Sequence, residues 1–206
     1  MLRIILLLSI AAVSHGRLKQ CKCVDIEPCT NIDSRTVLGC ADQCQSHASR
    51  TGASYPALRQ CYQEMEGTLN AVIKCVKNQL SNTCSRSGNP LTVRNFHPEL
   101  FKLALLKEIN DQLKRSGIKH DVVRFFRDDK AYSECQLKCM NDRVMKCFKD
   151  KKCGLNLPSN EALVSTLKQC ALSSGMGTDG FRKLCRCGVK AGARGLAQVC
   201  EKIVIS

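Results

Sequence analysis

The chain of 206 residues is basic and rich in cysteine, with 32 Lys and Arg, 18 Asp and Glu, 16 Cys and a formal net charge of +14. It has no Trp and only 4% aromatic residues, which is little material for a large aromatic core. No catalytic constellation, metal-ligand signature or phosphate-binding loop stands out, so we expect a protein that is not an enzyme.

The N-terminus has the layout of a secretory signal peptide. Arg3 supplies the positive charge, residues 4–13 are apolar except for one serine, and Ser14 and Gly16 are small residues before a cut at Arg17. The alternative is a membrane anchor, but a bilayer-spanning helix needs about 20 apolar residues. We therefore predict a signal peptide at 1–16 and a secreted, extracellular mature chain with no transmembrane segment.

All the cysteines follow this cut. In the oxidising secretory route an even number of cysteines favours disulfides. Zinc is the alternative, and it is disfavoured because no CxxC pair occurs and only three histidines follow the cut. We predict disulfides and no metal or other cofactor. The predicted disulfide residues are Cys21, Cys23, Cys29, Cys40, Cys44, Cys61, Cys75 and Cys84 in a first block, and Cys135, Cys139, Cys147, Cys153, Cys170, Cys185, Cys187 and Cys200 in a second.

These blocks divide the mature chain into a cysteine-rich helical module at 17–84, a cysteine-free helical linker at 85–134 and a second cysteine-rich helical module at 135–206. The modules resemble diverged repeats, because 16 residues separate Cys44 from Cys61 and also Cys153 from Cys170. Units this small bury little core, and four disulfides in each would supply much of the stability. Eight cysteines allow many pairings, so the connectivity is left open.

Four segments carry apolar residues at steps of three and four, which is the spacing of one helix face. They lie at 58–80, 98–117, 137–147 and 158–170. The second has proline at its start and glycine just past its end, as helices prefer, and the fourth has the start signal Pro158-Ser159. No strand alternation is seen. The predicted fold class is all-α and disulfide-rich, with two helical modules joined by an amphipathic helical segment.

Cysteine spacing within these helices constrains the bridges. Two cysteines four residues apart share one helix face with parallel Cβ directions, so each is expected to cross to a neighbouring helix. These pairs are Cys40 with Cys44 and Cys135 with Cys139. Cysteines separated by a single residue are also too close for an unstrained internal bond. These pairs are Cys21 with Cys23 and Cys185 with Cys187.

The amphipathic helix of the linker has two interpretations. In the first, it packs across both cysteine blocks. In the second, it meets a partner or an anionic membrane surface through its basic residues. These are Lys102, Lys107, Lys114 and Arg115, and the acidic Glu108 and Asp111 weaken the second interpretation.

The positive charge is concentrated in the second module, which contains 13 basic and 5 acidic side chains. Basic residues recur there every four positions, the spacing that would line one helix face, although three glycines weaken a helix in this stretch. The predicted anionic-ligand residues are Arg182, Lys183, Arg186, Lys190 and Arg194. Such a stripe suits sulfated or other anionic glycans of the extracellular matrix, and nucleic acid is not expected. The alternative is an ordinary solvated helix face.

The run Cys40-x3-Cys44-x16-Cys61-x13-Cys75-x8-Cys84, with the words Leu-Arg-Gln-Cys-Tyr and Val-Ile-Lys-Cys, resembles secreted helical cysteine-rich modules of nematodes. It is most similar to the domain found in chondroitin proteoglycan 4. The resemblance implies an extracellular, non-enzymatic matrix or eggshell-type protein. The chain departs from chondroitin attachment sites, because its Ser-Gly pairs lack acidic neighbours. We therefore expect it to bind a glycosaminoglycan rather than to carry one.

The resulting hypothesis is a secreted, non-enzymatic structural or interaction protein that binds anionic glycans. The alternative hypothesis is a cationic secreted effector or antimicrobial protein that acts on membranes.

Overall fold

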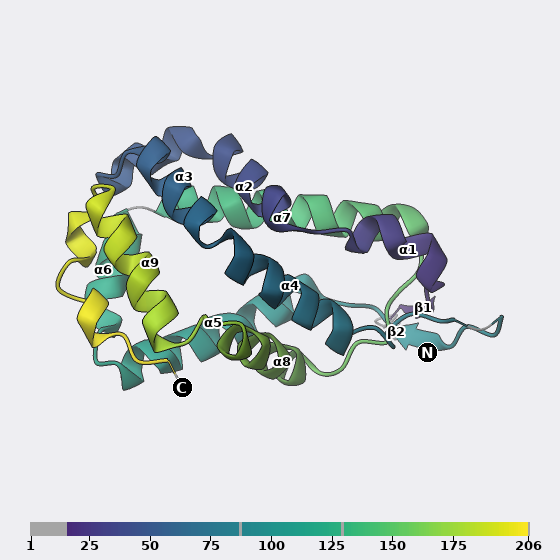
Figure 1. Cartoon of the computed structure of the whole chain (residues 1–206). Coiled ribbons are helices and arrows are strands. Elements are labelled where there is room, and N and C mark those ends of the chain that lie inside the picture. The colour runs from purple at the N-terminus through teal and green to yellow at the C-terminus, as the bar shows by residue number, and fades with distance from the viewer. Residues whose placement is uncertain (1–15, 87, 129, 206) are drawn as a thin grey trace, which may run out of the picture.

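The computed structural model of the chain describes residues 16–86, 88–128 and 130–205, and most of this backbone is helical (Figure 1). The predicted signal peptide lies outside the described residues, apart from Gly16. The elements are β1 (Arg17–Lys19), α1 (Cys23–Thr30), α2 (Ser34–Gln43), η1 (Gln45–Thr51), α3 (Tyr55–Glu64), α4 (Glu66–Gln79), β2 (Thr92–Arg94), α5 (Pro98–Arg115), α6 (Lys119–Asp128), α7 (Lys130–Lys151), α8 (Asn160–Ser173), α9 (Thr178–Lys190), η2 (Arg194–Leu196) and η3 (Cys200–Lys202). The predicted all-α class is confirmed.

Local signals explain where several helices begin and end. The Ser159 hydroxyl accepts a hydrogen bond from the N–H of Ala162 at 3.2 Å and so caps α8. Helix α5 has Pro98 in its first turn, and Gly117 follows its end with a left-handed φ of 68°. The prediction of one helix over 58–80 is wrong. Helices α3 and α4 are separated by Met65, whose φ of −96° and ψ of 2° leave the α region.

A two-stranded antiparallel sheet is present that the sequence did not indicate. Strand β1 pairs with β2, with Leu18 opposite the buried Val93. The backbone then continues beside the second cysteine block, because the N–H of Cys21 donates to the carbonyl of Gly154 at 2.8 Å. Strands of three residues are too short to show an alternating pattern.

Every cysteine is in a disulfide, and six of the eight bridges join the first block to the second. The bridges between blocks are Cys21–Cys153, Cys29–Cys147, Cys40–Cys139, Cys44–Cys135, Cys61–Cys187 and Cys75–Cys170. Only Cys23–Cys84 and Cys185–Cys200 lie within a block. The expectation of four bridges inside each block is therefore wrong, and the blocks are cross-linked into one unit.

The cysteines spaced four apart do cross to a neighbouring helix, as predicted. Cys40 of α2 and Cys44, the residue that caps the end of α2, are bonded to the pair on α7, as Cys40–Cys139 and Cys44–Cys135. Residue numbers rise along one helix while those of their partners fall along the other, so the two helices are antiparallel. Cys29 on α1 forms a further bridge to α7.

Two other bridges are reciprocal between the blocks. Cys61 on α3 is bonded to Cys187 on α9, and Cys75 on α4 is bonded to Cys170 on α8. The first helix of the α3–α4 pair is thus joined to the second helix of the α8–α9 pair, and the second helix of the former to the first helix of the latter. Two-fold arrangements of like units produce such reciprocal contacts, and the repeat itself stays a prediction.

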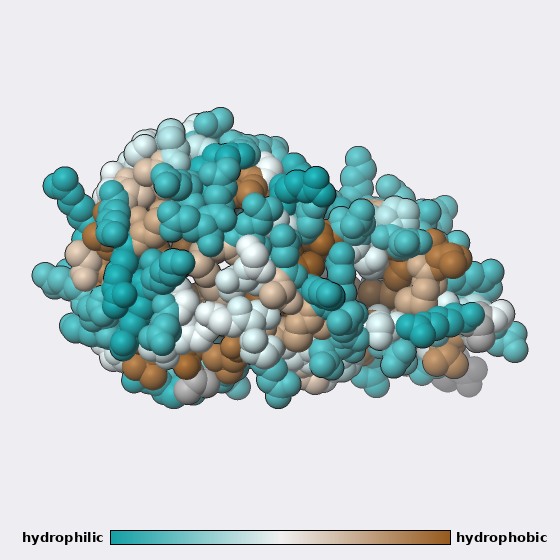
Figure 2. Space-filling view, viewed as in Figure 1, coloured by the Kyte–Doolittle hydropathy of each residue, from teal (hydrophilic) through white to brown (hydrophobic). Residues whose placement is uncertain are grey.

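The middle segment contacts both cysteine blocks, but its amphipathic helix α5 packs chiefly against α8 of the second block, so the first interpretation holds for the segment and not for this helix alone. Strand β2 pairs with β1, helix α5 packs against α8, and α6 contacts η1 and η2. In Figure 1 helices α3 and α4 lie on one side of a ring and α5, α6, α8 and α9 complete it. The face shown in Figure 2 is largely hydrophilic, with hydrophobic residues showing along its lower edge.

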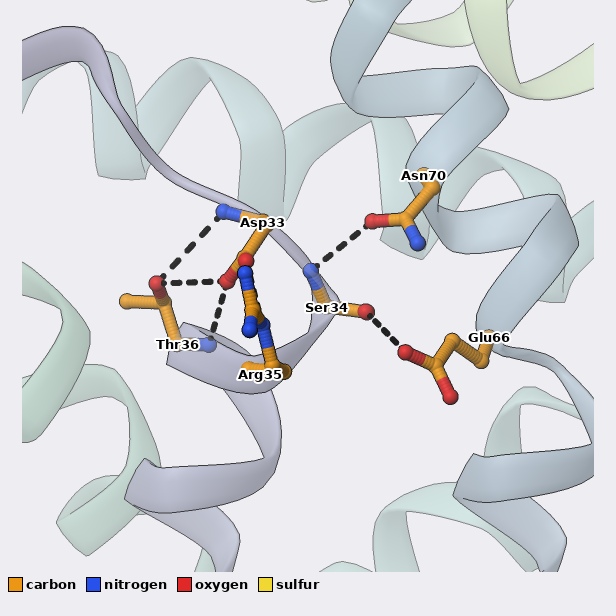
Figure 3. A network of polar contacts seen from close by, with 6 residues as sticks. All are labelled: Asp33, Ser34, Arg35, Thr36, Glu66 and Asn70. Carbon is orange, nitrogen blue, oxygen red and sulfur yellow. Dashed lines mark hydrogen bonds and ion pairs between the residues drawn. The ribbon is translucent and has the colours of Figure 1, made fainter.

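Helix α4 contains no buried residue, so its position depends on specific attachments. One of them is a polar network at the start of α2 (Figure 3). The buried Ser34 donates from its hydroxyl to Glu66 Oε1 at 2.8 Å, and its N–H donates to Asn70 Oδ1 at 2.9 Å. Asp33 and Thr36 form a capping box that holds the same turn in place.

We expect Ser34→Ala to destabilise the protein by about 1 to 3 kcal/mol, because the Glu66 carboxylate loses its hydroxyl donor next to a buried position. Urea unfolding followed by circular dichroism measures this. Arg35→Ala is the control, because its side chain is 85% exposed and its ion pair with Asp33 is a surface one. Equal effects of the two substitutions would show that the Ser34 contacts do not support α4.

Candidate functional site

A cavity of about 510 Å³ lies inside the helical ring. Its walls come from α3, α5, α6, α7, α8, α9 and η2, with Ile203 and Ile205 of the C-terminal segment. Figure 1 shows these elements on different sides of the same region. The volume is in the range of small-molecule pockets, about 300 to 1,000 Å³.

The lining of the cavity is overwhelmingly apolar. Each wall contributes large hydrophobic side chains, among them Leu58 from α3, Ile109 from α5, Phe125 from α6, Leu167 from α8 and Leu184 from α9. Polar side chains are few and stand mainly on α5 and α8. Such a lining offers a ligand burial of its apolar surface and little hydrogen bonding.

Helix α9 divides cleanly into two faces. Phe181, Leu184 and Gly188 line the cavity, and the basic residues stand on other sides of the helix. Gly188 is buried, yet a Cβ placed on it would meet nothing within 4 Å apart from its chain neighbours and the backbone of its own helix. The open space therefore lies directly beside this glycine.

The C-terminal segment forms one wall of the cavity, with Ile203 and Ile205 among the lining residues. Side chains of the helices hold its backbone. The Ser116 hydroxyl donates to the carbonyl of Val204 at 2.9 Å and accepts from its N–H at 3.0 Å. The hydroxyl of Thr178 contacts the backbone of Ile205 in the same way, at 3.3 and 3.0 Å. Residues 203–205 are thus held in place by side-chain hydrogen bonds, and we call them the C-terminal strap.

The polar part of the wall centres on Glu108 of α5. Gln112 Nε2 donates to Glu108 Oε1 at 2.9 Å, and the ammonium of Lys168 on α8 donates to the same oxygen at 3.1 Å. These hydrogen bonds hold the pKa of Glu108 below its usual value. The ion pair ties α5 to α8 at the edge of the cavity.

This ion pair predicts an acid-sensitive contact. A carboxyl group whose pKa is lowered in the folded state stabilises the protein above its ordinary value of 4.5, and that contribution is lost as the pH falls through the lowered value. We therefore expect the urea midpoint of the protein to fall on acidification. Glu108→Gln should show a smaller fall over the same range, whereas parallel curves would mean that Glu108 does not carry this dependence.

The predicted anionic-ligand residues have different surroundings. Arg182 Nε donates to the carbonyl of Ile203 at 3.1 Å, and Arg186 forms two hydrogen bonds to Glu201 at 2.6 and 2.7 Å. These two arginines hold the C-terminal strap. The hydrogen bonds from Arg186 also lower the pKa of Glu201.

The remaining three, Lys183, Lys190 and Arg194, are exposed. They do not all lie on one helix, because α9 ends at Lys190 and Arg194 belongs to η2. Gly192 between them has a φ of 117°, which an α-helix does not allow. A stripe on a single helix running to Arg194 is therefore wrong, although the five residues remain neighbours in the chain.

Within the described ranges, no group of three His, Cys, Asp or Glu side chains is placed to hold a metal ion. None of the helices in these ranges has the length and apolar character that crossing a membrane requires.

The cavity was missed from the sequence. Its lining comes from six α-helices that extend from α3 to α9. Apolar periodicity does not distinguish a residue facing a cavity from one facing a packed core. One signal was present. Helix α5 has leucine or isoleucine on more than one face, which is more than a single packing partner needs.

No protein-family model matches the chain, and neither a curated protein nor a solved structure matches it. The similarity to the chondroitin proteoglycan 4 domain therefore stays a prediction from cysteine spacing, and the geometry of the cavity is what a functional proposal has to explain.

Proposed function

We propose that this protein is a secreted, non-enzymatic binding protein that carries a small apolar molecule in its cavity. The single observation behind the proposal is the cavity of about 510 Å³ with its apolar walls. The eight disulfides support an extracellular setting, since such bridges persist in oxidising compartments.

The architecture suits a carrier because cross-links fix the positions of its walls. The walls α3 and α9 are bonded by Cys61–Cys187, and the wall α8 is bonded by Cys75–Cys170 to α4, which lies outside the lining. A chain without these bridges would gain by collapsing onto an empty apolar space. With them, the space stays open, and an apolar ligand fills it with a gain of about 25 cal/mol for each Å² of apolar surface buried.

A fluorescence titration with N-phenyl-1-naphthylamine, a neutral apolar probe, tests the proposal on the oxidised mature chain. We expect saturable binding of one probe per protein, and competition by aliphatic compounds. Native mass spectrometry of protein purified from a secreting host gives a second readout, in which a bound apolar molecule adds a discrete mass. The absence of saturable binding in the titration would refute the carrier function.

A second candidate function is the binding of anionic glycans, and the exposed Lys183, Lys190 and Arg194 support it. Replacing these three by alanine should lower the salt concentration at which the protein elutes from heparin. The control with the same change in net charge replaces Lys22, Lys74 and Lys77, which are exposed elsewhere. If both triple variants elute alike, retention reflects the overall charge and not a glycan site.

A further inference from the structure

We propose that the outer face of α5 docks on a membrane surface that carries anionic headgroups. This inference goes beyond the carrier function, since docking needs no cargo. Four large apolar side chains of α5 are exposed to solvent, and they follow one another at steps of three. They are Leu100, Leu103, Leu106 and Ile109.

The row of four apolar side chains runs across the surface of α5 towards the cavity. Residues three apart are neighbours on a helix, and a row of such neighbours crosses the helix surface obliquely. Leu103 stands in the middle with 62% of its surface exposed, and Ile109 at the end is 45% exposed and also lines the cavity. The apolar surface of α5 is therefore continuous from the outside of the molecule to the edge of the cavity.

Lysines border this row on both sides. Lys102 lies one turn before Leu106, and Lys107 lies one turn after Leu103, and both are exposed. Long lysine side chains extend along an apolar surface and place the ammonium group among headgroups. Leucines in the centre with lysines at the border are the composition of helices that lie in a membrane interface.

The acidic groups of this region mostly have nearby side-chain partners. Glu108 is turned to Lys168, Asp111 Oδ1 lies 3.7 Å from the ammonium of Lys114, and Glu99 Oε1 lies 3.1 Å from His97 Nδ1. Glu161 on α8 offsets part of the charge of Lys107. The two acidic residues that weakened a membrane interpretation of the sequence are thus both paired.

A second copy of the chain is a less suitable occupant of this face. In a two-fold contact the same patch meets itself, which brings the lysines of two chains together, each chain with a formal net charge of +14. An anionic bilayer offers the leucines an apolar phase and the lysines opposite charge. The charge of the chain therefore favours the bilayer.

Vesicle co-sedimentation of the full mature chain, with its disulfides intact, tests the docking surface. We expect binding to phosphatidylcholine vesicles that contain phosphatidylserine, weak binding to phosphatidylcholine alone, and a decrease with salt. Leu103→Asp should lower the partition coefficient by about tenfold or more, because a charged side chain replaces a leucine that membrane docking would bury. Replacing both Lys102 and Lys107 by glutamate should abolish the preference for anionic vesicles.

Leu137→Asp is the matched control, because Leu137 is a leucine of α7 with 54% of its surface exposed. It should bind vesicles like the wild type, and an equal loss in both variants would overturn the proposal. Concentration-dependent dimerisation that Leu103→Asp removes would also overturn it in favour of a second copy. Probe binding in solution should persist in Leu103→Asp, so failure of docking and failure of the carrier function are separate results.

Discussion

Replacing Gly188 by leucine is expected to abolish binding of the apolar probe while raising the stability of the protein. The new side chain enters the cavity, since Gly188 lines it and the position of its Cβ is open apart from its chain neighbours and its own helix backbone. It fills volume that the probe needs. We expect a loss of at least about 1.4 kcal/mol of binding free energy, which lowers the affinity about tenfold. The same change replaces a glycine inside α9, which favours the helix by about 1 kcal/mol. Probe titration and thermal unfolding measure the two effects.

Opposite changes in binding and stability would exclude a damaged fold as the cause of lost binding. Gly67→Leu is the matched control, because Gly67 is a glycine of α4 that is exposed, has open space at its Cβ and does not line the cavity. It should leave probe affinity unchanged. Normal affinity in Gly188→Leu would show that the probe binds elsewhere, for example on the exposed leucines of α5.

Removing the Cys75–Cys170 bridge, with both cysteines replaced by alanine, is expected to cost about 2 to 5 kcal/mol of stability. The bridge joins α4 to α8 across 95 residues of chain. Because none of the residues of α4 is fully buried, we expect its partly exposed contacts with α8 to replace the lost bridge only in part. The amides of 66–79 should exchange faster with deuterium than those of α7, and the denaturant midpoint should fall.

The Cys44–Cys135 bridge provides the comparison. Its removal leaves Cys40–Cys139 one helical turn away, so α2 and α7 remain joined. The chemical change is the same, and the expected loss of stability is smaller, with little change in exchange over 66–79. If the two double variants behave alike, α4 is held by packing and not by its bridge.

Much of the fold could be predicted from local signals. Pro98 and Gly117 mark α5, Ser159 marks the start of α8, and the four-residue spacing of cysteines on α2 and α7 indicates bridges between helices. Each of these signals is satisfied by neighbours in the chain or by the geometry of one helix. They are therefore readable without knowledge of the tertiary structure.

The features that were missed all depend on distant parts of the chain. Met65 has no proline and no adjacent glycine to announce the break between α3 and α4. The spacing of the cysteines along the chain does not reveal that the two blocks pair with each other, as in Cys61–Cys187. From the sequence, Gly192 is only one of three weak helix formers in this stretch, whereas its positive φ ends the basic stripe. The cavity requires all of these contacts at once.

The interleaved bridges also have a consequence for the synthesis of the protein. Six cysteines of the first half have partners that emerge 91 to 132 residues later, and only Cys23–Cys84 can close early. For Cys61 the wait of 126 residues is about 6 to 25 s at ordinary translation rates. Exposed thiolates exchange with any disulfide they meet during that time. The yield of native protein should therefore depend on a disulfide isomerase that corrects mispairing until the C-terminal third has emerged.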